Sequence, residues 1–462
     1  MAVQKTISPV DGSVFVERAL AASAGIDAAL NRAVAAQRAW RAVPGELRAV
    51  ICRKFCDAFE SKKDAIATEL TWQMGRPIRY TANEVRGTLE RARHMIDIAS
   101  EALADIDAGP KADFKRFVRR EPLGVVFTVA AWNYPYLIAV NSVVPAIMAG
   151  NSVVLKHSAQ TPLCAERFAE SFREAGLPEG VFQVLHLSHE DTERVVKDPR
   201  VAFVAFTGSV AGGHAIQRAI ADRFIGAGLE LGGCDPAYVR HDANIVHAVE
   251  NLVDGAFFNS GQSCCGVQRI YVHERLYDDF VEGAVALTKQ YVLGNPTEQA
   301  TTLGPVVRTS AAEQVRRQIG ASIEAGAVPS IDDRDFPASR AGTPYVAPQL
   351  LLNAGPRSAV MREEIFGPVA GVVRVRSDQE AIDLMNDSAF GLTAAIWTED
   401  AAAAEAIGDR VETGTWFMNR CDYLDPALAW VGVKDSGRGC TLSRVGYEHL
   451  TRPKSFHLRT RT

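Results

Sequence analysis

The sequence predicts an α/β protein built on largely parallel sheets, and three observations support this expectation. Short apolar runs such as GVVFTVA (124–130) and VAFVAFTG (201–208) alternate with helical segments such as TPLCAERFAESFREAG (161–176). A second alternation of the same kind begins near Gly232. The chain has 462 residues, which is too long for a single hydrophobic core. Two or three domains are therefore expected. Strands that alternate with helices predict a parallel sheet with helices on both faces.

The part of the chain before these strands has a different pattern. From residue 25 to about residue 108, apolar residues recur at spacings of three and four, which predicts several helices. The segment DFKRFVRREP (113–122) follows, with two phenylalanines among four basic residues. This composition is typical of an exposed strand or arm.

Composition narrows the class of protein. Hydrophobic residues make up 47%, charged residues 23%, and the formal net charge is −5, so neither nucleic acid nor an anionic membrane is expected as a partner. The eight cysteines are scattered without a paired CxxC pattern, so we expect no metal site and reduced thiols in a cytoplasmic protein. No apolar segment follows a basic start at the N-terminus, so no signal peptide is expected.

One long uncharged stretch needs a decision. Between Glu121 and Lys156 lie 34 residues without a formal charge, enough to raise the possibility of a membrane span. Prolines and asparagines interrupt the stretch, and several of them would leave backbone groups unpaired in lipid. We therefore expect buried strands and a helix of an α/β core.

The segment FFNSGQSCCGVQR (257–269) contains two adjacent cysteines after a glycine turn. An unperturbed thiol is only a few per cent ionised at neutral pH, yet it is a strong nucleophile. Thiol chemistry on a carbonyl also needs hydrogen-bond donors for the developing oxyanion and a route for releasing the adduct.

Five motifs in order resemble the NAD(P)-dependent aldehyde dehydrogenase superfamily. They are AWNYP (131–135), FTGSVAGG (206–213), LELGGCDP (229–236), FFNSGQSCCG (257–266) and EEIFGPV (363–369), and together they span essentially the whole chain. The resemblance implies that Cys264 is the nucleophile, that Glu230 is the general base, and that Asn133 with the Cys264 backbone N–H stabilises the oxyanion. Cys265 is expected to be a packing residue.

The resemblance also implies a fold and its boundaries. Two Rossmann-like parallel-sheet domains and a small β oligomerisation arm are expected, as a homodimer or homotetramer. The predicted boundaries are 1–112 and 123–231 for the cofactor-binding domain, 232–444 for the catalytic domain, and 113–122 with 445–462 for the arm.

The implied cofactor is NAD or NADP. Lys156 matches the lysine that hydrogen-bonds the adenosine ribose, and three residues later Ala159 replaces a glutamate that many members use to repel a 2′-phosphate. Loss of that carboxylate is expected to permit NADP, since repulsion between close, partly buried like charges reaches a few kcal/mol. His157 is a further candidate donor. The remaining matched cofactor positions are Trp132, Gly208, Ser209, Gly213, Leu231, Glu364 and Phe366.

The residues that would contact the substrate come from the C-terminal part of the chain and from the AWNYP motif. Tyr134, Tyr423 and Trp430 are expected to line the aldehyde tunnel, and Arg420 is a candidate for a substrate carboxylate. The stretch that begins LKHSAQTPLCAERF resembles the semialdehyde-oxidising branch of the family. A semialdehyde is therefore one candidate substrate, and simple aliphatic or aromatic aldehydes are others.

Three functions follow from these residues. The leading one is hydrolytic oxidation of an aldehyde to a carboxylate through a Cys264 thiohemiacetal and thioester. The second is a CoA-acylating dehydrogenase, against which Glu230 argues because that reaction needs no activated water. The third is a non-redox esterase or a binding protein on the same fold.

Overall fold

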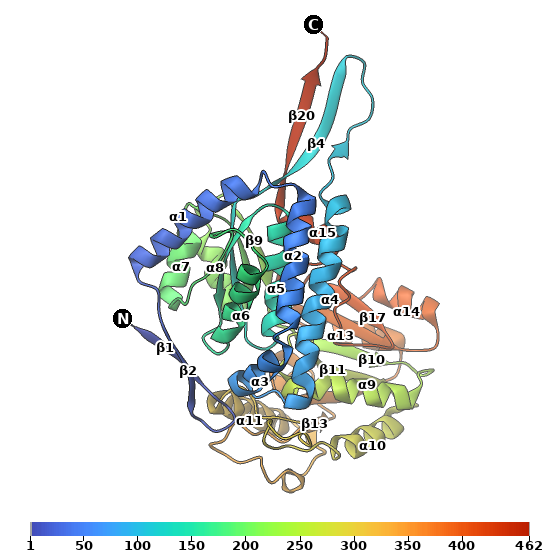
Figure 1. Ribbon diagram of the computed structural model, residues 1–462. Coiled ribbons are helices and arrows are strands. Elements are labelled where there is room, and N and C mark those ends of the chain that lie inside the picture. The colour runs from blue at the N-terminus through green and yellow to red at the C-terminus, as the bar shows by residue number, and fades with distance from the viewer. Residues whose placement is uncertain (1, 462) are drawn as a thin grey trace.

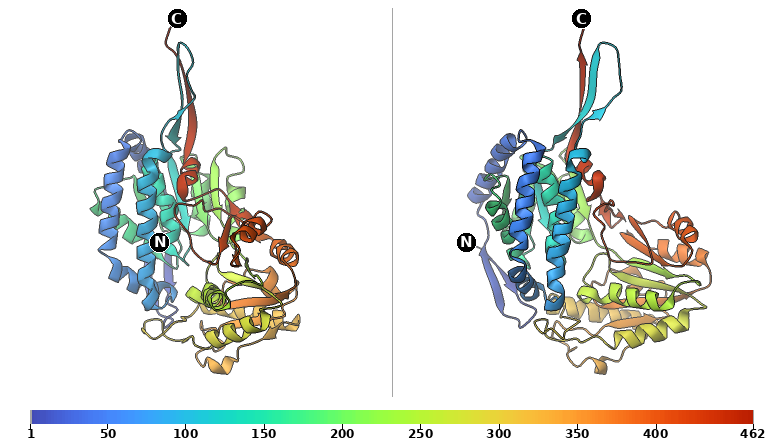
Figure 2. Two further views of the ribbon diagram at one scale, coloured as in Figure 1. Left: turned by 90° about the vertical axis from the view of Figure 1, so that its right-hand side faces the viewer. Right: turned by 45° about the vertical axis from the view of Figure 1, so that its right-hand side comes forward.

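The computed structural model describes residues 2–461, which form two sheet-based lobes and a projecting arm (Figure 1). The first lobe contains most of the N-terminal half, and the second contains most of the C-terminal half (Figure 2). This arrangement confirms the α/β class with two parallel-sheet units and a β arm. The predicted domain boundaries stay predictions, and near its end the chain returns to the first sheet through β19 (Gly437–Arg438).

The first lobe is built on a six-stranded sheet in the order β19-β9-β8-β5-β6-β7. All pairings are parallel except that of β19 with β9. Every residue of β5 and β6 is buried, as expected for central strands covered on both faces. The strands are β5 (Val125–Ala130), β6 (Ser152–His157), β7 (Phe182–Val184), β8 (Val201–Thr207) and β9 (Gly226–Glu230).

Two helical layers enclose this sheet. One layer packs against alternate residues such as Val126 and Leu155, and the other packs against Phe127 and Val154. The first layer contains α2 (Gly45–Glu60), α3 (Lys63–Met74), α4 (Ile78–Ala102), α5 (Pro135–Met148) and α6 (Pro162–Glu174), and the second contains α1 (Ser23–Trp40), α7 (His189–Lys197) and α8 (Val210–Ala219).

The second lobe is built on a seven-stranded sheet in the order β12-β13-β14-β11-β10-β16-β17, parallel except at β12. The strands are β10 (Asp235–Val239), β11 (Val267–His273), β12 (Val328–Pro329), β13 (Gln349–Leu352), β14 (Val369–Val375), β16 (Thr393–Trp397) and β17 (Thr415–Met418). The helices are α9 (Ile245–Phe257), α10 (Tyr277–Thr288), α11 (Thr309–Glu324), α12 (Ala359–Arg362), α13 (Asp378–Asn386) and α14 (Ala401–Gly408).

The arm consists of β4 (Phe114–Pro122) and β20 (Thr451–Arg459), which pair antiparallel along their whole length and project from the body (Figure 1). Phe117 stacks on Phe456 with 4.5 Å between ring centroids, and Arg119 lies over both rings. The short β3 (Ile106–Asp107) completes this sheet, and α15 (Ser443–His449) precedes β20. The arm is thus an aromatic ribbon with a basic surface.

Three smaller elements complete the chain. The N-terminus forms a hairpin of β1 (Val3–Ile7) and β2 (Val14–Ala19), which the sequence pattern did not predict, and β15 (Phe390–Gly391) pairs with β18 (Val433–Lys434). Two short 3-10 helices cover Phe258–Gly261 and Asp333–Asp335.

The uncharged stretch forms β5, α5 and β6 of the first lobe. Across residues 2–461, no helix combines the length and the apolar character that a membrane crossing requires.

Candidate active site

Cys264 follows a tightly constrained turn at the end of α9. Asn259 and Ser260 have φ values of 54° and 56°, in the left-handed region that L-residues rarely adopt. Gly261 continues the turn with φ 69°, and a Cβ there would lie 2.0 Å from the carbonyl oxygen of Gly367. Only glycine fits at position 261, and the contact joins the cysteine segment to the EEIFGPV segment.

The two adjacent thiols have different surroundings. Cys264 is half-buried and lines a cavity between the lobes, which we call the central cavity. Cys265 also contributes to this wall but is only 4% exposed, and its Sγ donates to Oδ1 of Asp422 at 2.9 Å. The neighbouring Cys264 thiol, together with burial and the Asp422 carboxyl, raises the pKa of Cys265 well above its ordinary value. The raised pKa favours the protonated form of Cys265, and Cys264 is the more exposed thiol of the pair.

Glu230 is the last residue of β9, and its carboxylate is held from two sides. The Thr207 hydroxyl donates to Oε2 at 3.2 Å, and the Thr441 hydroxyl donates to Oε1 at 2.7 Å. Burial raises the pKa of Glu230, and these two hydrogen bonds oppose that shift. A carboxylate with a raised pKa in a cavity has the property that a general base needs.

The Glu230 and Cys264 segments touch through backbone atoms. A Cβ at Gly233 would lie 2.0 Å from the carbonyl oxygen of Cys264, so this position also requires glycine. Both Cys264 and Glu230 line the central cavity, which encloses about 1330 Å³ up to its open mouth. The structure thus brings together two of the three predicted catalytic residues in one wall.

Asn133 lies beside the same loop. Its side-chain nitrogen donates to the carbonyl oxygen of Gln262 at 3.2 Å, which leaves a second N–H on that nitrogen. Among the described residues, the wall of the central cavity includes Tyr134 but not Asn133. Gln262 is two residues before Cys264, so this contact nonetheless holds the Asn133 amide beside the cysteine segment.

A buried ion pair holds Asn133 in place, and the sequence interpretation missed it. The Arg76 guanidinium bonds the Glu84 carboxylate, the backbone oxygen of Asn133 and, at 3.0 Å, Oδ1 of Asn259. Arg76 is 2% exposed and Glu84 is 1% exposed. Removing one partner of such a pair typically costs about 3–5 kcal/mol, because the remaining charge stays buried. Glu84 could have been found from the sequence, because it is a charged residue on the apolar face of a predicted helix.

The three predicted substrate residues, Tyr134, Tyr423 and Trp430, all line the central cavity. The Tyr423 hydroxyl donates to Oε1 of Glu90 at 2.9 Å, and the Arg420 guanidinium lies 3.5 Å from the centre of its ring. Arg420 itself is exposed and stacks on this ring.

The wall contains further charged residues that were not singled out from the sequence: Arg86, Glu90, Arg91, Asp254 and Asp422. Arg91 is 9% exposed, and its Nη1 donates to the backbone oxygen of Leu137 at 3.0 Å and to Oδ1 of Asn141 at 3.2 Å. Burial raises the pKa of Asp422 to about 6. The wall therefore carries both signs of charge, and it does not select a substrate charge by itself.

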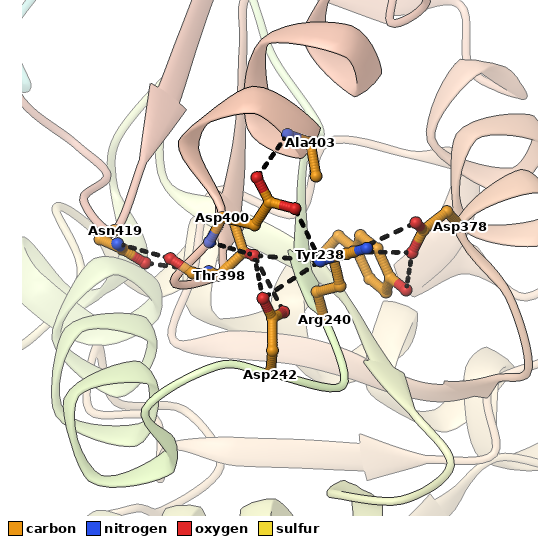
Figure 3. A network of polar contacts seen from close by, with 8 residues as sticks. All are labelled: Tyr238, Arg240, Asp242, Asp378, Thr398, Asp400, Ala403 and Asn419. Atoms are coloured by element: carbon orange, nitrogen blue, oxygen red, sulfur yellow. Dashed lines mark hydrogen bonds and ion pairs between the residues drawn. The ribbon is translucent and has the colours of Figure 1, made fainter.

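A polar network fixes the strand ends that precede residues 420–424 (Figure 3). Arg240 after β10 pairs with Asp242 and Asp378, both at 3.1 Å, and Thr398 after β16 bonds Asp242. The side chain of Asn419 after β17 bonds both the backbone N–H and the carbonyl of Thr398. The last members of the network are Tyr238, Asp400 and Ala403. Three strand ends are thus tied together directly before the cavity wall.

The predicted cofactor residues of the first lobe lie at the carboxyl ends of β8, β5 and β6, three consecutive strands of the sheet, with Trp132 after β5. Lys156 is in β6, and Gly208 and Ser209 join β8 to α8, whose N-terminal N–H groups are suited to bind phosphate. The Ser209 hydroxyl caps α8 by accepting from the N–H of Gly212 at 3.2 Å. A Cβ at Gly213 would meet Leu231 at 2.7 Å, so α8 packs closely on β9. This edge fits a dinucleotide.

His157 differs from the expectation. It is 1% exposed, and its ring bonds the backbone oxygen of Pro135, the hydroxyl of Thr161 and the N–H of Ser158. Burial lowers the pKa of His157 to about 4. The hypothesis that His157 offers a donor to the cofactor is therefore wrong, since its ring is used within the first lobe.

The predicted nicotinamide-end residues gather across the two lobes. Trp132 meets Phe366 edge to face at 5.6 Å between centroids. The Glu364 carboxylate accepts from the N–H of Gly233 at 3.1 Å, and burial raises its pKa to about 7. Leu231 is buried, with its N–H bonded to Ser436. The aromatic pair of Trp132 and Phe366 is suited to contact the nicotinamide ring, and the buried Glu364 carboxyl is suited to bind a ribose hydroxyl.

Comparisons with known proteins agree with this geometry. A model of the aldehyde dehydrogenase family matches residues 2–456. A succinate-semialdehyde dehydrogenase [NADP(+)] of Mycobacterium avium is 34% identical over 453 residues, covering 97% of this chain and 95% of that protein. A succinate semialdehyde dehydrogenase [NAD(P)+] of Escherichia coli is 32% identical over 444 residues, covering 96% and 95%.

A solved structure has the same fold. The succinic semialdehyde dehydrogenase of Streptococcus pyogenes, crystallised in complex with NADP+, has a TM-score of 0.94 and 28% identity, covering 99% of this chain and 100% of that one. With a family match over nearly the whole length and relatives above 30% identity, the chain belongs to the aldehyde dehydrogenase family.

Proposed function

We propose that this protein oxidises an aldehyde to the carboxylate with NAD(P)+, and that Cys264 and Glu230 carry out the two halves of the reaction. The observation that carries the proposal is that Cys264 and Glu230 line one cavity, while the neighbouring thiol, Cys265, is buried and has a raised pKa. Membership of the family supports the reaction class.

In the first half, the Cys264 thiolate adds to the aldehyde carbon and a C–S bond forms. The carbonyl oxygen becomes an alkoxide, which the free N–H of the Asn133 side chain and the backbone N–H of Cys264 can stabilise. One such donor is typically worth about 3–4 kcal/mol in the transition state. A bound NAD(P)+ would supply the acceptor for the hydride that leaves the thiohemiacetal carbon. The enzyme then carries a thioester on Cys264.

In the second half, water attacks the thioester carbon and Glu230 takes its proton. The C–S bond breaks, the thiolate of Cys264 is restored, and the carboxylate product leaves with two protons released to solvent, one of them by way of Glu230. The raised pKa of Glu230 suits this role because a stronger base accepts the proton more readily.

The cofactor residues would be those at the carboxyl ends of β5, β6 and β8. The N-terminus of α8 would hold phosphate, Lys156 the adenosine ribose and Glu364 the nicotinamide ribose, with Trp132 and Phe366 beside the ring. Lys156 is buried without a side-chain hydrogen bond among the described residues, which leaves its amine available. Ala159 offers no carboxylate against a 2′-phosphate, so both NAD and NADP are proposed as cofactors.

Two finer points stay predictions. Relatives that act on succinate semialdehyde support a semialdehyde as the first substrate to try. The aromatic ribbon of β4 and β20 supports a homodimer or homotetramer in which the arm contacts a second copy. A cytoplasmic location also remains a prediction from the sequence.

The alternatives would have to use the same cavity differently. A CoA-acylating enzyme would pass the acyl group to a thiol and would not need Glu230 as a base, yet Glu230 is held by two hydroxyl donors. An esterase would use Cys264 without the cofactor. The esterase leaves the cofactor edge beside β8 unexplained, whereas the CoA-acylating enzyme would also use that edge and differs in its need for CoA.

A panel of aldehydes with each cofactor tests the reaction. We expect absorbance at 340 nm to rise with both NAD+ and NADP+ and without added CoA, with a semialdehyde among the substrates. Absence of any change across the panel would contradict the dehydrogenase, and an absolute need for CoA would favour the acylating reaction. A kcat/KM preference for NAD+ above roughly a thousandfold would contradict the role given to Ala159.

The assignment of the nucleophile is tested by the adjacent pair. Cys264→Ser should lower kcat by more than about a thousandfold, because a hydroxyl is far less ionised than a thiol. Cys265→Ala is the matched control, and we expect it to keep most of the activity. If Cys265→Ala lost more than about a hundredfold and Cys264→Ser did not, the roles would be exchanged.

The general base is tested by separating the two halves of the reaction. Glu230→Gln should give a burst of NAD(P)H equal to the enzyme concentration, followed by slow turnover, because the thioester accumulates. In the unmodified enzyme deacylation should rise with pH through the raised pKa of Glu230, since the base acts only when ionised. Glu230→Gln should lose this dependence. Unchanged turnover in stopped-flow and steady-state assays would exclude Glu230.

A further inference from the structure

Glu230 separates two cavities. On one side is the central cavity with Cys264, and on the other is a smaller second cavity of about 570 Å³ between β8, β9, α5 and the C-terminal segment. Ile138, Asn141, Thr207 and Glu230 contribute to both walls. The lining of the second cavity is largely apolar, with side chains such as Phe203 and Leu229, and polar groups including Thr207, Glu230 and Thr441 could hydrogen-bond a water molecule there.

Thr441 lines the second cavity and reaches Glu230 from that side. Its hydroxyl donates to Oε1 at 2.7 Å, the shorter of the two hydrogen bonds on this carboxylate. Thr207 lies on β8 directly opposite Glu230 of β9 and belongs to the same sheet. Thr441 comes from the other end of the chain, so its bond is a separate constraint on the carboxylate.

The backbone of Thr441 is itself fixed. Its N–H donates to the carbonyl oxygen of Trp430 at 3.0 Å, and its carbonyl oxygen accepts from the N–H of Trp430 at 2.9 Å. Trp430 is buried and lines the central cavity. One antiparallel bridge therefore connects the wall of the central cavity to the hydroxyl that holds Glu230.

Other charged and titratable groups also face Glu230. Arg91 lies on α4 across the central cavity, and its positive charge lowers the pKa of Glu230 after the two hydroxyl bonds. Cys265 and Asp422 share the central cavity, while Arg438, Cys440 and His449 line the second one. Glu230 in turn raises the pKa of Cys440, after burial. Among the described residues, the hydrogen bonds to the Glu230 carboxylate come from Thr207 and Thr441 alone.

We propose that Thr441 is a positioning residue for thioester hydrolysis, holding the Glu230 carboxylate between the two cavities so that it meets water entering from the second one. The inference rests on the proposed role of Glu230 as the general base. In the step concerned, Glu230 accepts a proton from water, the water oxygen bonds the acyl carbon, and the C–S bond to Cys264 breaks. Thr441 touches none of the reacting atoms.

The test compares Thr441→Val, which removes the hydroxyl at nearly constant shape, with Thr441→Ser, which keeps it. Thr441→Val should give a burst of NAD(P)H, as Glu230→Gln does, and slow steady-state turnover about tenfold to a hundredfold, the usual range for a buried hydrogen bond to a charged group. The pH midpoint of deacylation should move upward, because Thr441 stabilises the ionised carboxylate. Thr441→Ser should restore both the rate and the midpoint.

A double-mutant cycle separates this inference from the proposed function. In a Glu230→Gln background, Thr441→Val should slow turnover by less than about twofold further, since both changes act through one carboxylate. If the effects of the two substitutions on turnover were fully additive, the positioning role of Thr441 would be overturned, while the role of Glu230 as general base would still stand. Normal deacylation with an unmoved pH midpoint in Thr441→Val, or loss of the burst, would overturn it as well. If Thr441→Val fails to fold, Thr441→Ala and Thr441→Ser give the same comparison.

Discussion

The site depends on two places where backbones touch and no side chain fits. At Gly233 the segment after Glu230 lies against the carbonyl of Cys264, and at Gly261 the turn before Cys264 lies against Gly367. These contacts join three segments from different parts of the chain into one unit. Interiors are close-packed, so a shift of even one methyl group at these contacts would displace the thiol from the base. Backbone packing at Gly233 and Gly261 therefore fixes the positions from which the Cys264 and Glu230 side chains reach the cavity.

The surroundings of Cys265 and Glu230 support the proposed roles of Cys264 in forming the C–S bond and of Glu230 in hydrolysing it. Cys264 is the proposed nucleophile because Cys265 is buried against Asp422, with a raised pKa that favours its protonated form. Glu230 is made a stronger base by burial and is then restrained by hydroxyl donors on both oxygens. The base thus stays within the wall of the cavity without forming a direct ion pair, which would hold its proton affinity too low for the hydrolytic step.

The alternation of strands and helices was sufficient to predict the α/β class. The motifs pointed to Cys264 and Glu230, which both line the central cavity, but not to charged residues of its wall such as Arg91 and Asp422. The N-terminal hairpin was missed because β1 and β2 are short and partly exposed, with little apolar pattern. Arg76 and Arg91 were missed because a helical pattern does not say which neighbouring element covers a charged position. His157 was misjudged because one of its partners, Pro135, lies at the start of α5, whose position relative to β6 depends on tertiary packing.

The central claim is that Cys264 carries the acyl group and Glu230 removes it. The most direct measurement is peptide mass spectrometry of Glu230→Gln enzyme, acid-quenched within one turnover of aldehyde and NAD(P)+. The account predicts the mass of one acyl group on the peptide that contains both cysteines, with fragmentation placing it on Cys264. An acyl group on Cys265, or an unmodified peptide after a full burst of NAD(P)H, would contradict it.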